Sequence, residues 1–369
     1  MGWGQSAVEA MVNRGVSQPF WQGKRVFLTG HTGFKGCWLY RCLERLGAEV
    51  FGYALCAPKN SLHAKIYGLE SANGIYADIR DRERLSRELA DFSPDIVFHL
   101  AAQPLVRESY RQPAYTYETN VMGTVNLLEA VRLTPSVKAV VVVTTDKCYR
   151  DMDWEWGYRE TDPLGGADPY SSSKACVELL CDAWRMSYLD KTGVALATAR
   201  TGNVIGGGDW ADDRIVPDAM RAFQAGVVLS IRSPRAVRPW QHVLEPLRGY
   251  MMLAQRLCEE GHASQTTWNF GPSTSDAQNV EAVTGRLSEL WGCGADYEIS
   301  EDCTLRESHT LRLDSSRAEQ KLGWKPCLGF DESIKMTVDW YKRVYNGESA
   351  SAVMDEQITS YMDKVVAHG

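Results

Sequence analysis

The stretch Val26-Phe-Leu-Thr-Gly-His-Thr-Gly-Phe-Lys-Gly36 decides the fold of this chain. It begins with apolar residues that predict a short buried strand, and Cys37–Leu46 after it predicts a helix. Between strand and helix, Gly30, Gly33 and Gly36 mark a tight turn. Such a turn brings bare backbone and a helix N-terminus close to a bound phosphate. Because the spacing is GxxGxxG rather than GxGxxG, the flanking strand and helix carry the prediction of dinucleotide binding.

Strands and helices alternate through the first part of the chain. The further expected strands are Glu49–Leu55, Ile75–Ile79, Asp95–Ala102, Val137–Thr145 and Ala195–Thr201. The expected helices between them are Asp81–Asp91, Pro113–Arg132 and Tyr170–Tyr188. This alternation predicts an α/β fold, a Rossmann-type doubly wound parallel sheet that binds ligands at the carboxyl ends of its strands.

The pattern loosens from about Ile215, where proline, tryptophan and arginine accumulate. Helices are expected over Pro246–Cys258, Asn279–Leu290 and Asp331–Tyr345, with a short strand over Trp268–Phe270. These elements predict a smaller, mixed α/β C-terminal lobe that binds substrate. We therefore expect an N-terminal extension (1–22), a dinucleotide-binding domain (23–201, with some later segments returning to it), a substrate lobe (mainly 202–346) and a tail (347–369).

The composition excludes several classes of protein. The 369 residues carry a net charge of −7, which argues against a nucleic-acid surface, since such surfaces are basic. No apolar run approaches the roughly 20 residues of a membrane-spanning helix, so we expect no membrane partner. The ten cysteines show no CxxC pair and no cluster with histidine, which favours reduced thiols in a cytoplasmic protein and no metal site. A short helix is expected at Ser6–Asn13, and Met1–Ser6 matches a myristoylation pattern that is common by chance.

Tyr170 and Lys174 form the pair that points to a reaction. They lie four residues apart, so they share one face of the expected helix. A tyrosine with a pKa of about 10 is a poor base at neutral pH. A lysine ammonium one turn away and an oxidised nicotinamide both lower that pKa, because they stabilise the phenolate. Thr145, at the end of a preceding strand, is placed to orient the reacting oxygen by a hydrogen bond.

The choice between NAD and NADP stays open on these residues. In a dinucleotide fold, an acidic residue near the end of the second strand holds the ribose 2′-hydroxyl. Here the residues from Tyr53 to Asn60 contain no acid, and Lys59 faces either a 2′-phosphate or solvent. Ala101 and Ala102, at the end of the fourth strand, either leave room for a cofactor or pack tightly against their neighbours.

Seven dispersed runs resemble the extended short-chain dehydrogenase/reductase superfamily, and more narrowly its CDP-glucose 4,6-dehydratase family. The runs are TGHTGFKG (29–36), HLAAQPLVR (99–107), TNVMGTVNLLEAVR (119–132), TDKCY (145–149), DPYSSSK (168–174), GNVIGGGDW (202–210) and RPWQHVLEPL (238–247). The resemblance covers nearly the whole chain except its first eighteen or so residues. The departures are Ser172, Arg150 and Asp151, and none of these has a named role in the family.

The resemblance implies NAD as cofactor and CDP-glucose as substrate, converted to CDP-4-keto-6-deoxyglucose. Tyr170 would take the proton of the sugar 4-hydroxyl while hydride leaves carbon 4. A base would then remove the proton on carbon 5, an acid would help the 6-hydroxyl leave as water, and hydride would return to carbon 6. Asp146 is the implied acid and needs a raised pKa. Lys147 replaces the glutamate base of dTDP-sugar dehydratases, and the sequence leaves open whether it is the base or positions the sugar.

The motifs and the resemblance together assign residues to both ligands. Those expected at the cofactor are Gly30, Thr32, Gly33, Phe34, Gly36, Asp78, Ile79, Leu100, Ala101, Ala102, Tyr170 and Lys174. Those expected at the substrate are Gln103, Asn203, Arg238 and Trp240. Arginine forks suit a diphosphate, and Arg238 is favoured over Arg232 and Arg235 because it lies in a matching run. Trp210 is an alternative to Trp240 for lining the nucleotide pocket.

The resemblance also implies a homodimer formed through the helices over Thr119–Arg132 and Ser171–Tyr188, and a role in deoxysugar supply for lipopolysaccharide O-antigen. Two other readings remain. Another nucleotide-sugar dehydratase or a 4-epimerase shares the scaffold, but an epimerase does not need Asp146 and Lys147. A non-catalytic dinucleotide sensor is the more distant alternative, and such proteins usually lose the tyrosine or the lysine of the YxxxK pair.

Overall fold

The computed structural model describes residues 15–68, 73–273, 276–300 and 311–368. The helix expected over Ser6–Asn13 and the myristoylation pattern at Met1–Ser6 lie outside these residues.

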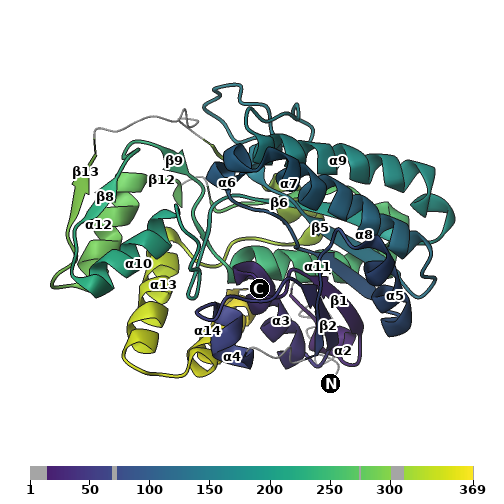
Figure 1. Cartoon of the computed structure of the whole chain (residues 1–369), viewed down its shortest axis with the longest axis horizontal. Coiled ribbons are helices and arrows are strands. Elements are labelled where there is room, and N and C mark those ends of the chain that lie inside the picture. Colours follow the sequence, from purple (N-terminus) through teal and green to yellow (C-terminus); the bar gives the residue numbers. More distant parts are fainter. Residues whose placement is uncertain (1–14, 69–72, 274–275, 301–310, 369) are drawn as a thin grey trace, which may run out of the picture.

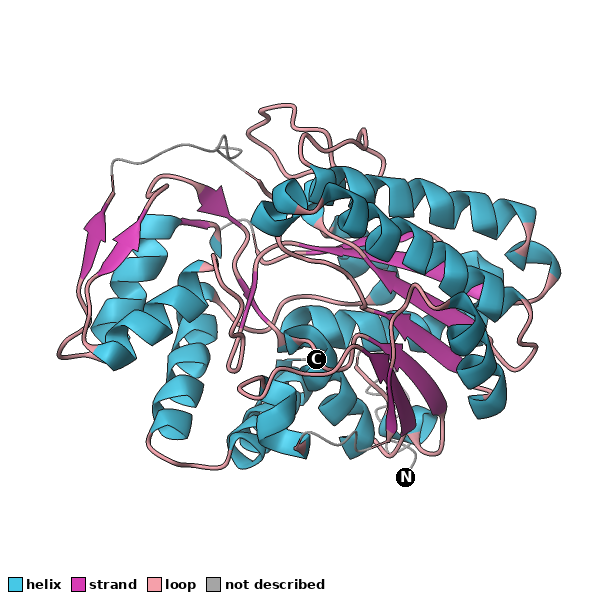
Figure 2. Ribbon diagram, in the orientation of Figure 1, coloured by secondary structure: helices cyan, strands magenta, loops and turns pink. Residues whose placement is uncertain are grey.

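In the described residues, a seven-stranded sheet forms the centre of the larger part of the molecule (Figures 1 and 2). Its strands in spatial order are β3 (Gly74–Tyr76), β2 (Glu49–Ala54), β1 (Arg25–Thr29), β4 (Ile96–His99), β5 (Ala139–Val143), β6 (Ala195–Thr201) and β11 (Thr267–Phe270). All neighbouring strands pair in parallel. Strand order reverses between β1 and β4, which is the switch point where such sheets bind ligands. The predicted Rossmann-type sheet is confirmed.

Helices cover both faces of the sheet and bury its central strands. The helices α3 (Phe34–Arg45) and α11 (Leu244–Glu260) pack on one face, and α5 (Arg82–Phe92), α8 (Gly123–Arg132) and α9 (Pro169–Ser187) pack on the other. Val26 and Leu28 of β1 belong to the first core and Phe27 to the second, because side chains alternate along a strand. A sheet covered on both faces explains why every residue of β5 is buried and apolar.

Several strands end earlier than the sequence predicts. β3 ends at Tyr76, β4 at His99 and β5 at Val143, so the residues after them leave the sheet at its carboxyl edge. The predicted helix Pro113–Arg132 is also divided. It consists of α7 (Pro113–Tyr117), a wider π-helical turn η1 (Glu118–Met122) and α8. A π-helical turn of this kind is a local widening rather than a break in the helix.

The smaller lobe is built from α10 (Ile215–Ala225), α12 (Val280–Trp291), α13 (Phe330–Tyr345) and short paired strands. The pairs are β7 (Val204–Ile205) with β10 (Gln241–His242), β9 (Val237–Arg238) with β12 (Gln278–Asn279), and β8 (Leu229–Ile231) with β13 (Tyr297–Ile299). β11 follows part of this lobe in sequence but joins the main sheet, and α11 packs on that sheet.

Within the tail 347–369, α14 (Ala350–His368) packs against α13 and α4 (Leu62–Tyr67). Asp355 of α14 accepts two hydrogen bonds from the Arg41 guanidinium at 2.8 and 2.6 Å. The remaining elements are α2 (Gln18–Trp21), α6 (Val106–Arg111), and the short turns η2 (Asp146–Cys148), η3 (Leu189–Lys191), η4 (Gly261–Ser264) and η6 (Ala318–Leu322).

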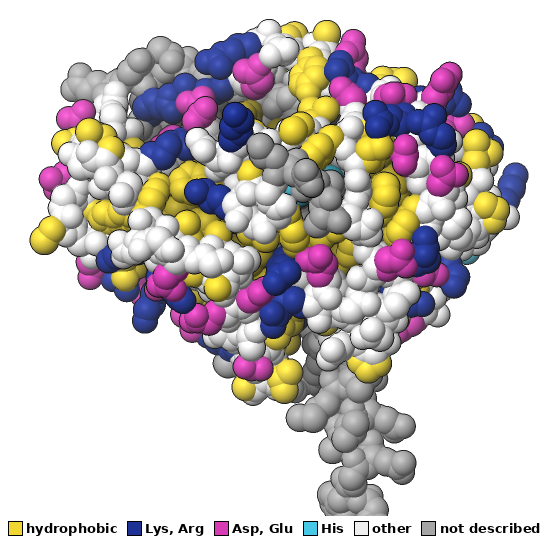
Figure 3. All heavy atoms as spheres, turned by 60° about the horizontal axis from the view of Figure 1, so that its bottom comes forward, with side chains coloured by type: hydrophobic (Ala, Val, Ile, Leu, Met, Phe, Trp, Pro, Cys, Tyr) yellow, Lys and Arg dark blue, Asp and Glu magenta, His cyan; other side chains and the backbone are white. Residues whose placement is uncertain are grey.

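The surface and the helices bear on the classes of partner. Figure 3 shows basic and acidic side chains interspersed over one face of the molecule. None of the helices in the described part of the chain combines the length and the apolar character that crossing a bilayer requires. Among the same residues, no cluster of three or more histidine, cysteine or acidic side chains is placed to hold a metal.

Candidate active site

A cavity of about 1810 Å³ lies at the carboxyl ends of the strands and is lined from both the sheet and the smaller lobe. Pockets for a single small ligand are roughly 300–1,000 Å³, so this cavity has room for two ligands. The loop between 151 and 168 supplies part of its wall. Tyr158 of that loop stacks on Tyr149 with ring centroids 5.0 Å apart, and Trp154 stacks on Tyr158 at 5.6 Å.

The glycine turn forms one end of the cavity. Gly30 has a φ of +77°, and a Cβ there would lie 2.7 Å from the amide nitrogen of Ala101. A Cβ at Gly36 would lie 2.0 Å from the carbonyl oxygen of Gly30. Gly33 differs, because a Cβ there would meet only Gly30 O at 3.4 Å. The space beside the N-terminus of α3 is therefore open, and it fits the phosphates of a dinucleotide.

The other expected cofactor residues also line the cavity. The lining includes Thr32, Phe34, Asp78, Ile79, Leu100, Ala101 and Ala102. Asp78 follows β3, and its carboxylate pairs with Arg80 at 2.7 Å. Hydrogen bonds from Arg80 lower the pKa of Asp78, so this carboxylate is charged at neutral pH. The end of β2 carries no acidic residue. Asp78, which follows β3, therefore supplies the acidic group on this part of the cavity wall.

Tyr170 and Lys174 enter the cavity from the first turns of α9. The Asp168 carboxylate caps this helix by accepting the Ser171 N–H at 2.9 Å, and Tyr170 is only 8% exposed. Burial raises the pKa of Tyr170 to about 12, although its hydrogen bond with the Thr145 side chain lowers it. The Lys174 ammonium donates to the carbonyl oxygen of Val143 at 3.2 Å. Burial lowers the pKa of Lys174 to about 8.

The direction of the Tyr170 shift differs from the sequence argument. We expect Lys174 and an oxidised nicotinamide to lower the pKa of Tyr170, whereas the chain's own residues raise it. The reason is desolvation, which penalises the phenolate more than the surrounding residues favour it. In the protein alone Tyr170 is therefore a neutral phenol at physiological pH.

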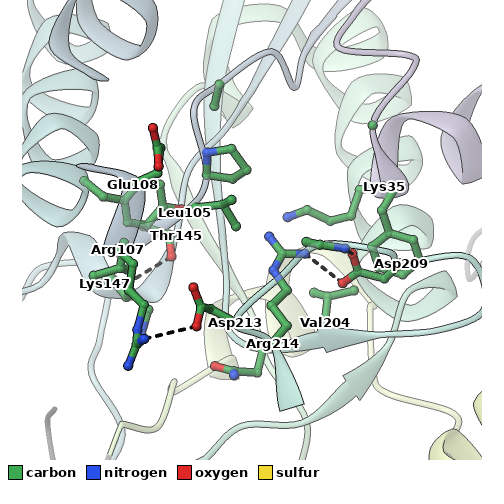
Figure 4. Close-up of a pocket in the computed structure, with 18 of the residues that line it drawn as sticks. Lys35, Leu105, Arg107, Glu108, Thr145, Lys147, Val204, Asp209, Asp213 and Arg214 are labelled. Atoms are coloured by element: carbon green, nitrogen blue, oxygen red, sulfur yellow. Dashed lines mark hydrogen bonds and ion pairs between the residues drawn. The ribbon is translucent and has the colours of Figure 1, made fainter. Parts of the chain in front are cut away.

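Asp146 and Lys147 follow Thr145 on the short turn η2. The Thr145 hydroxyl donates to Oδ1 of Asp146 at 3.0 Å, so Thr145 joins this carboxyl group to Tyr170. Asp146 is 1% exposed, and its Oδ2 has no hydrogen-bond partner among the described residues. Burial raises the pKa of Asp146 against the opposing charges of Lys147 and Arg238. Lys147 is half-buried and lines the cavity (Figure 4).

Three of the expected substrate residues line the cavity from the smaller lobe. Asn203 accepts the Gln241 N–H on its backbone oxygen at 3.1 Å. Arg238 donates to the backbone oxygen of Val237 at 2.9 Å and is 5% exposed. Trp240 is nearly buried, with its indole N–H donated to the oxygen of Gln278 at 2.9 Å.

The remaining candidates separate into two groups. Arg232 and Trp210 line the cavity, whereas Gln103 and Arg235 are not among its described lining residues. Gln103 is buried, and its amide donates to the Thr116 hydroxyl at 2.9 Å. Its place is thus in the hydrogen bonds that anchor the loop after β4 to α7.

The cavity also contains charged residues that sequence reasoning missed. Lys35 donates to the Thr201 hydroxyl at 3.3 Å, and burial lowers its pKa to about 7. Arg214 pairs with Asp209 at 2.8 Å, on the same side of the pocket as Lys35 (Figure 4). Lys35 stands within the glycine run, and Arg214 closely follows the GNVIGGGDW run. The sequence held a signal that could have identified both residues: each is charged and lies inside, or shortly after, a run that matches the family.

A further ion pair joins the two sides of the cavity. The Asp213 carboxylate lies 3.2 Å from Arg107 of α6 and 3.2 Å from Arg232, which follows β8. All three side chains are between 33% and 41% exposed, and Figure 4 shows Arg107 directed at Asp213. No local sequence pattern indicates this contact, because Arg107 and Asp213 lie far apart in the chain.

Comparisons with known proteins identify the family of this chain. The family model described as GDP-mannose 4,6 dehydratase matches residues 27–337. CDP-glucose 4,6-dehydratase of Salmonella typhimurium is 49% identical over 353 residues, which are 94% of this chain and 98% of that protein. The structure of a dTDP-glucose 4,6-dehydratase from Streptomyces venezuelae, with NAD bound, is 25% identical with a TM-score of 0.75 and covers 87% of this chain and 98% of its own.

A UDP-glucose 4-epimerase from Thermus thermophilus, solved with NAD, shares the fold at 24% identity and a TM-score of 0.74, over 86% of this chain and 99% of its own. The CDP-glucose enzyme of Salmonella typhimurium thus matches in sequence over nearly the full length, while the two solved structures match in fold. The chain belongs to the nucleotide-sugar 4,6-dehydratase family, within the extended short-chain dehydrogenase/reductase superfamily.

Proposed function

We propose that this protein converts CDP-glucose to CDP-4-keto-6-deoxyglucose, with NAD as its cofactor. The observation that carries the proposal is the Asp146 carboxyl group, buried at the cavity and joined through Thr145 to Tyr170. Oxidation and reduction at carbon 4 need no second acid. Loss of water across carbons 5 and 6 does need one, and a carboxyl group with a raised pKa supplies it.

The glycine turn and the residues after β3 and β4 would hold NAD. The open space at Gly33 suits the pyrophosphate, and the Asp78 carboxylate at the cavity wall would accept a hydrogen bond from a ribose hydroxyl. When bound, NAD supplies the hydride acceptor for carbon 4, the hydride donor for carbon 6 and a positive charge that favours the tyrosine phenolate. NAD in the dehydratase from Streptomyces venezuelae supports this choice.

Tyr170 takes the proton of the sugar 4-hydroxyl, and Thr145 orients the same oxygen. Lys174 contributes a positive charge one helical turn away, although burial limits the fraction that is protonated at higher pH. Asp146 then gives its proton to the departing 6-hydroxyl. Lys147, half-buried at the cavity wall, either removes the proton on carbon 5 or positions the sugar.

The smaller lobe would bind the nucleotide part of the substrate. Arg238, and Arg232 beside Asp213, present guanidinium forks that match a diphosphate. Asn203 and Trp240 flank the same part of the cavity. The 49% identity with the CDP-glucose enzyme of Salmonella typhimurium supports cytidine as the base.

The direct test is incubation of the purified protein and NAD with CDP-glucose, and in parallel with UDP-, GDP- and dTDP-glucose. The expected result is a 4-keto-6-deoxy product from CDP-glucose, with no net reduction of the cofactor. A 4-epimer, or net accumulation of reduced cofactor in step with product, would contradict the proposal. If the enzyme prefers another of these nucleotide glucoses, the proposed substrate would change and the proposed reaction class would stand.

We also infer a homodimer formed through the outer surfaces of α8 and α9. Exposed apolar side chains gather on these helices: Met122 and Leu133 at the ends of α8, and Leu179 and Met186 on α9, are 51–73% exposed. Pairing these helices with those of a second copy would bury them. Light scattering should give twice the chain mass, and Met186→Glu should halve it; a monomeric wild-type protein would contradict this.

A cytoplasmic location and supply of O-antigen deoxysugars remain predictions from the family resemblance.

A further inference from the structure

A line of three functional side chains runs along one face of α9. Tyr170, Lys174 and Glu178 are spaced four residues apart, so each lies about 6 Å further along the helix than the last. Tyr170 and Lys174 line the cavity, whereas Glu178 is not among the described lining residues and is 1% exposed. The reaction steps described above do not use this buried carboxylate.

Glu178 joins α9 to three strands of the sheet. Its Oε1 accepts a hydrogen bond from the Thr144 hydroxyl, and its Oε2 accepts one from Thr198 at 2.7 Å. The same Oε2 lies 3.3 Å from the Thr267 hydroxyl. Thr144 follows β5 and directly precedes Thr145, while Thr198 lies in β6 and Thr267 in β11. Glu178 therefore fixes the helix of Tyr170 against the strand end that carries Thr145.

Arg200 completes the group from β6. Its Nη2 pairs with Oε2 of Glu178 at 2.9 Å, and both side chains are at most 3% exposed. Its Nη1 donates to the backbone oxygen of Glu160 at 3.2 Å. Its guanidinium carbon lies 4.7 Å from the centroid of the Tyr149 ring. The Tyr149 hydroxyl donates to Asn269 at 2.8 Å. Tyr149 directly follows η2, so Arg200 fixes the turn that carries Asp146 and Lys147.

We propose that the buried Glu178–Arg200 pair is a positioning element of the active site, which sets the helix of Tyr170 and Lys174 at a fixed distance from the turn of Asp146 and Lys147. The proposal rests on the proposed function, in which one sugar must meet all four groups during a single turnover. Placement matters strongly in such a site, since an error of about 1 Å costs on the order of a hundredfold in rate.

Two physical points favour positioning over a purely stabilising role. A buried ion pair is weak evidence of stability, because desolvation offsets much of its attraction. The charge of Glu178 also raises the pKa of Lys174 against the effect of burial, so this carboxylate acts on a group inside the cavity. The same carboxylate thus orders the helix and favours the charged form of Lys174.

The chain offers a matched control in Glu245 and Arg248 of α11. These side chains are 0% and 2% exposed and lie 3.7 Å apart. Glu245 also accepts the backbone N–H groups of Cys327 and Leu328, each at 2.7 Å, and the Tyr361 hydroxyl at 2.9 Å. None of these residues is among the described residues that line the cavity. Glu245→Gln therefore removes a carboxyl group at a similar depth, away from the chemistry.

The experiment compares Glu178→Gln and Glu245→Gln with the wild-type enzyme, on whichever nucleotide-glucose the wild type converts. Both variants should lower the midpoint of thermal unfolding. Glu178→Gln should lower kcat about tenfold or more while KM stays within about twofold, whereas Glu245→Gln should leave both within about twofold. Glu178→Gln that is folded with wild-type kcat, or an equal loss of kcat in Glu245→Gln, would overturn the proposal.

Arg200→Lys provides a second measurement that does not depend on removing the charge. Lysine keeps the positive charge facing Glu178 but loses the second arm of the fork and the contact with Tyr149. We expect a folded enzyme with kcat lowered several-fold and an unchanged KM. Wild-type kcat in folded Arg200→Lys would count against the proposal even if Glu178→Gln fails to fold. An inactive wild-type enzyme would instead refute the proposed function, so the two failures are distinguishable.

Discussion

Replacement of Asp146 by asparagine separates the two halves of the proposed reaction. Asparagine has nearly the same shape, and its side-chain oxygen still accepts the hydrogen bond that Thr145 donates at 3.0 Å. The change removes only the acidic proton. Tyr170, Lys174 and Thr145 remain in place, so abstraction of the 4-hydroxyl proton should continue while loss of water slows.

The magnitudes of the two effects differ enough to be told apart. Positioned general acids contribute about 10²–10⁴ in rate, which corresponds to roughly 3–5 kcal/mol at 1.36 kcal/mol per factor of ten. The stability cost should not exceed about 1 kcal/mol, because the conserved shape retains the Thr145 contact. Asp146→Asn should therefore unfold close to the wild-type temperature and lose almost all turnover.

The assay is a single-turnover reaction followed by the absorbance of reduced nicotinamide and by quenched product analysis. In Asp146→Asn, reduced cofactor should form and persist because the elimination step is blocked. Asp213→Asn is the control for loss of a cavity carboxylate: Asp213 pairs with Arg232 at the proposed diphosphate site, so its loss should change substrate binding but leave the return of hydride intact at saturating substrate. If Asp146→Asn turns over within about tenfold of the wild-type rate, or if hydride never leaves carbon 4, Asp146 is not the acid.

The pH dependence of stability gives an independent check on Asp146. Burial raises its folded pKa above the usual 3.8, so the folded protein binds this proton more tightly than the unfolded chain does. The stabilising contribution is full below 3.8 and is lost as the pH rises through the raised folded value. The stability of the wild type relative to Asp146→Asn should therefore fall as the pH rises above 3.8; a rise would contradict the assigned shift.

Three further variants test other parts of the site, and Gly36→Ala serves as a steric contrast to Gly33→Ala. Tyr170→Phe should bind NAD normally yet transfer no hydride, as measured by cofactor titration and single-turnover absorbance; retained turnover would remove Tyr170 from its role. Lys147→Met should abolish exchange of the carbon-5 proton with deuterated solvent, and exchange and turnover at wild-type level would exclude both of its proposed roles. Gly36→Ala places a Cβ 2.0 Å from a backbone oxygen and should cost about 1–3 kcal/mol or more of stability. Gly33→Ala meets only one atom at 3.4 Å, so it should fold normally and lose NAD affinity by titration; unchanged affinity would place the pyrophosphate elsewhere.

The part of the fold that local patterns specify was predictable from sequence. The strand from Ala195 to Thr201 was predicted with its observed bounds; four of its seven residues are alanine or leucine, and the whole strand is buried. The π-helical turn at Glu118–Met122 had no such signature. It accompanies the hydrogen bonds of Asn120 to Gln103 and Ser173, which are contacts between residues far apart in the chain.

In the candidate site, too, the residues set by local sequence were predictable and those set by contacts between distant segments were not. Residues in long matching runs, such as Thr145, Tyr170 and Arg238, line the cavity as expected. Gln103 belongs to such a run but is buried beside the site, because a run identifies a segment and not the direction of each side chain. Asp213 bridges arginines from both sides of the cavity, and only the folded chain brings these three together.

The most direct test of the whole account is the fate of a deuterium label placed on carbon 4 of CDP-glucose. A site in which one cofactor receives hydride from carbon 4 and returns it within the same turnover must deliver the label to carbon 6 of the same molecule. We predict a CDP-4-keto-6-deoxyglucose that carries deuterium on its methyl group. Label that remains on carbon 4 of an epimer, or that appears in free reduced cofactor, would contradict the account.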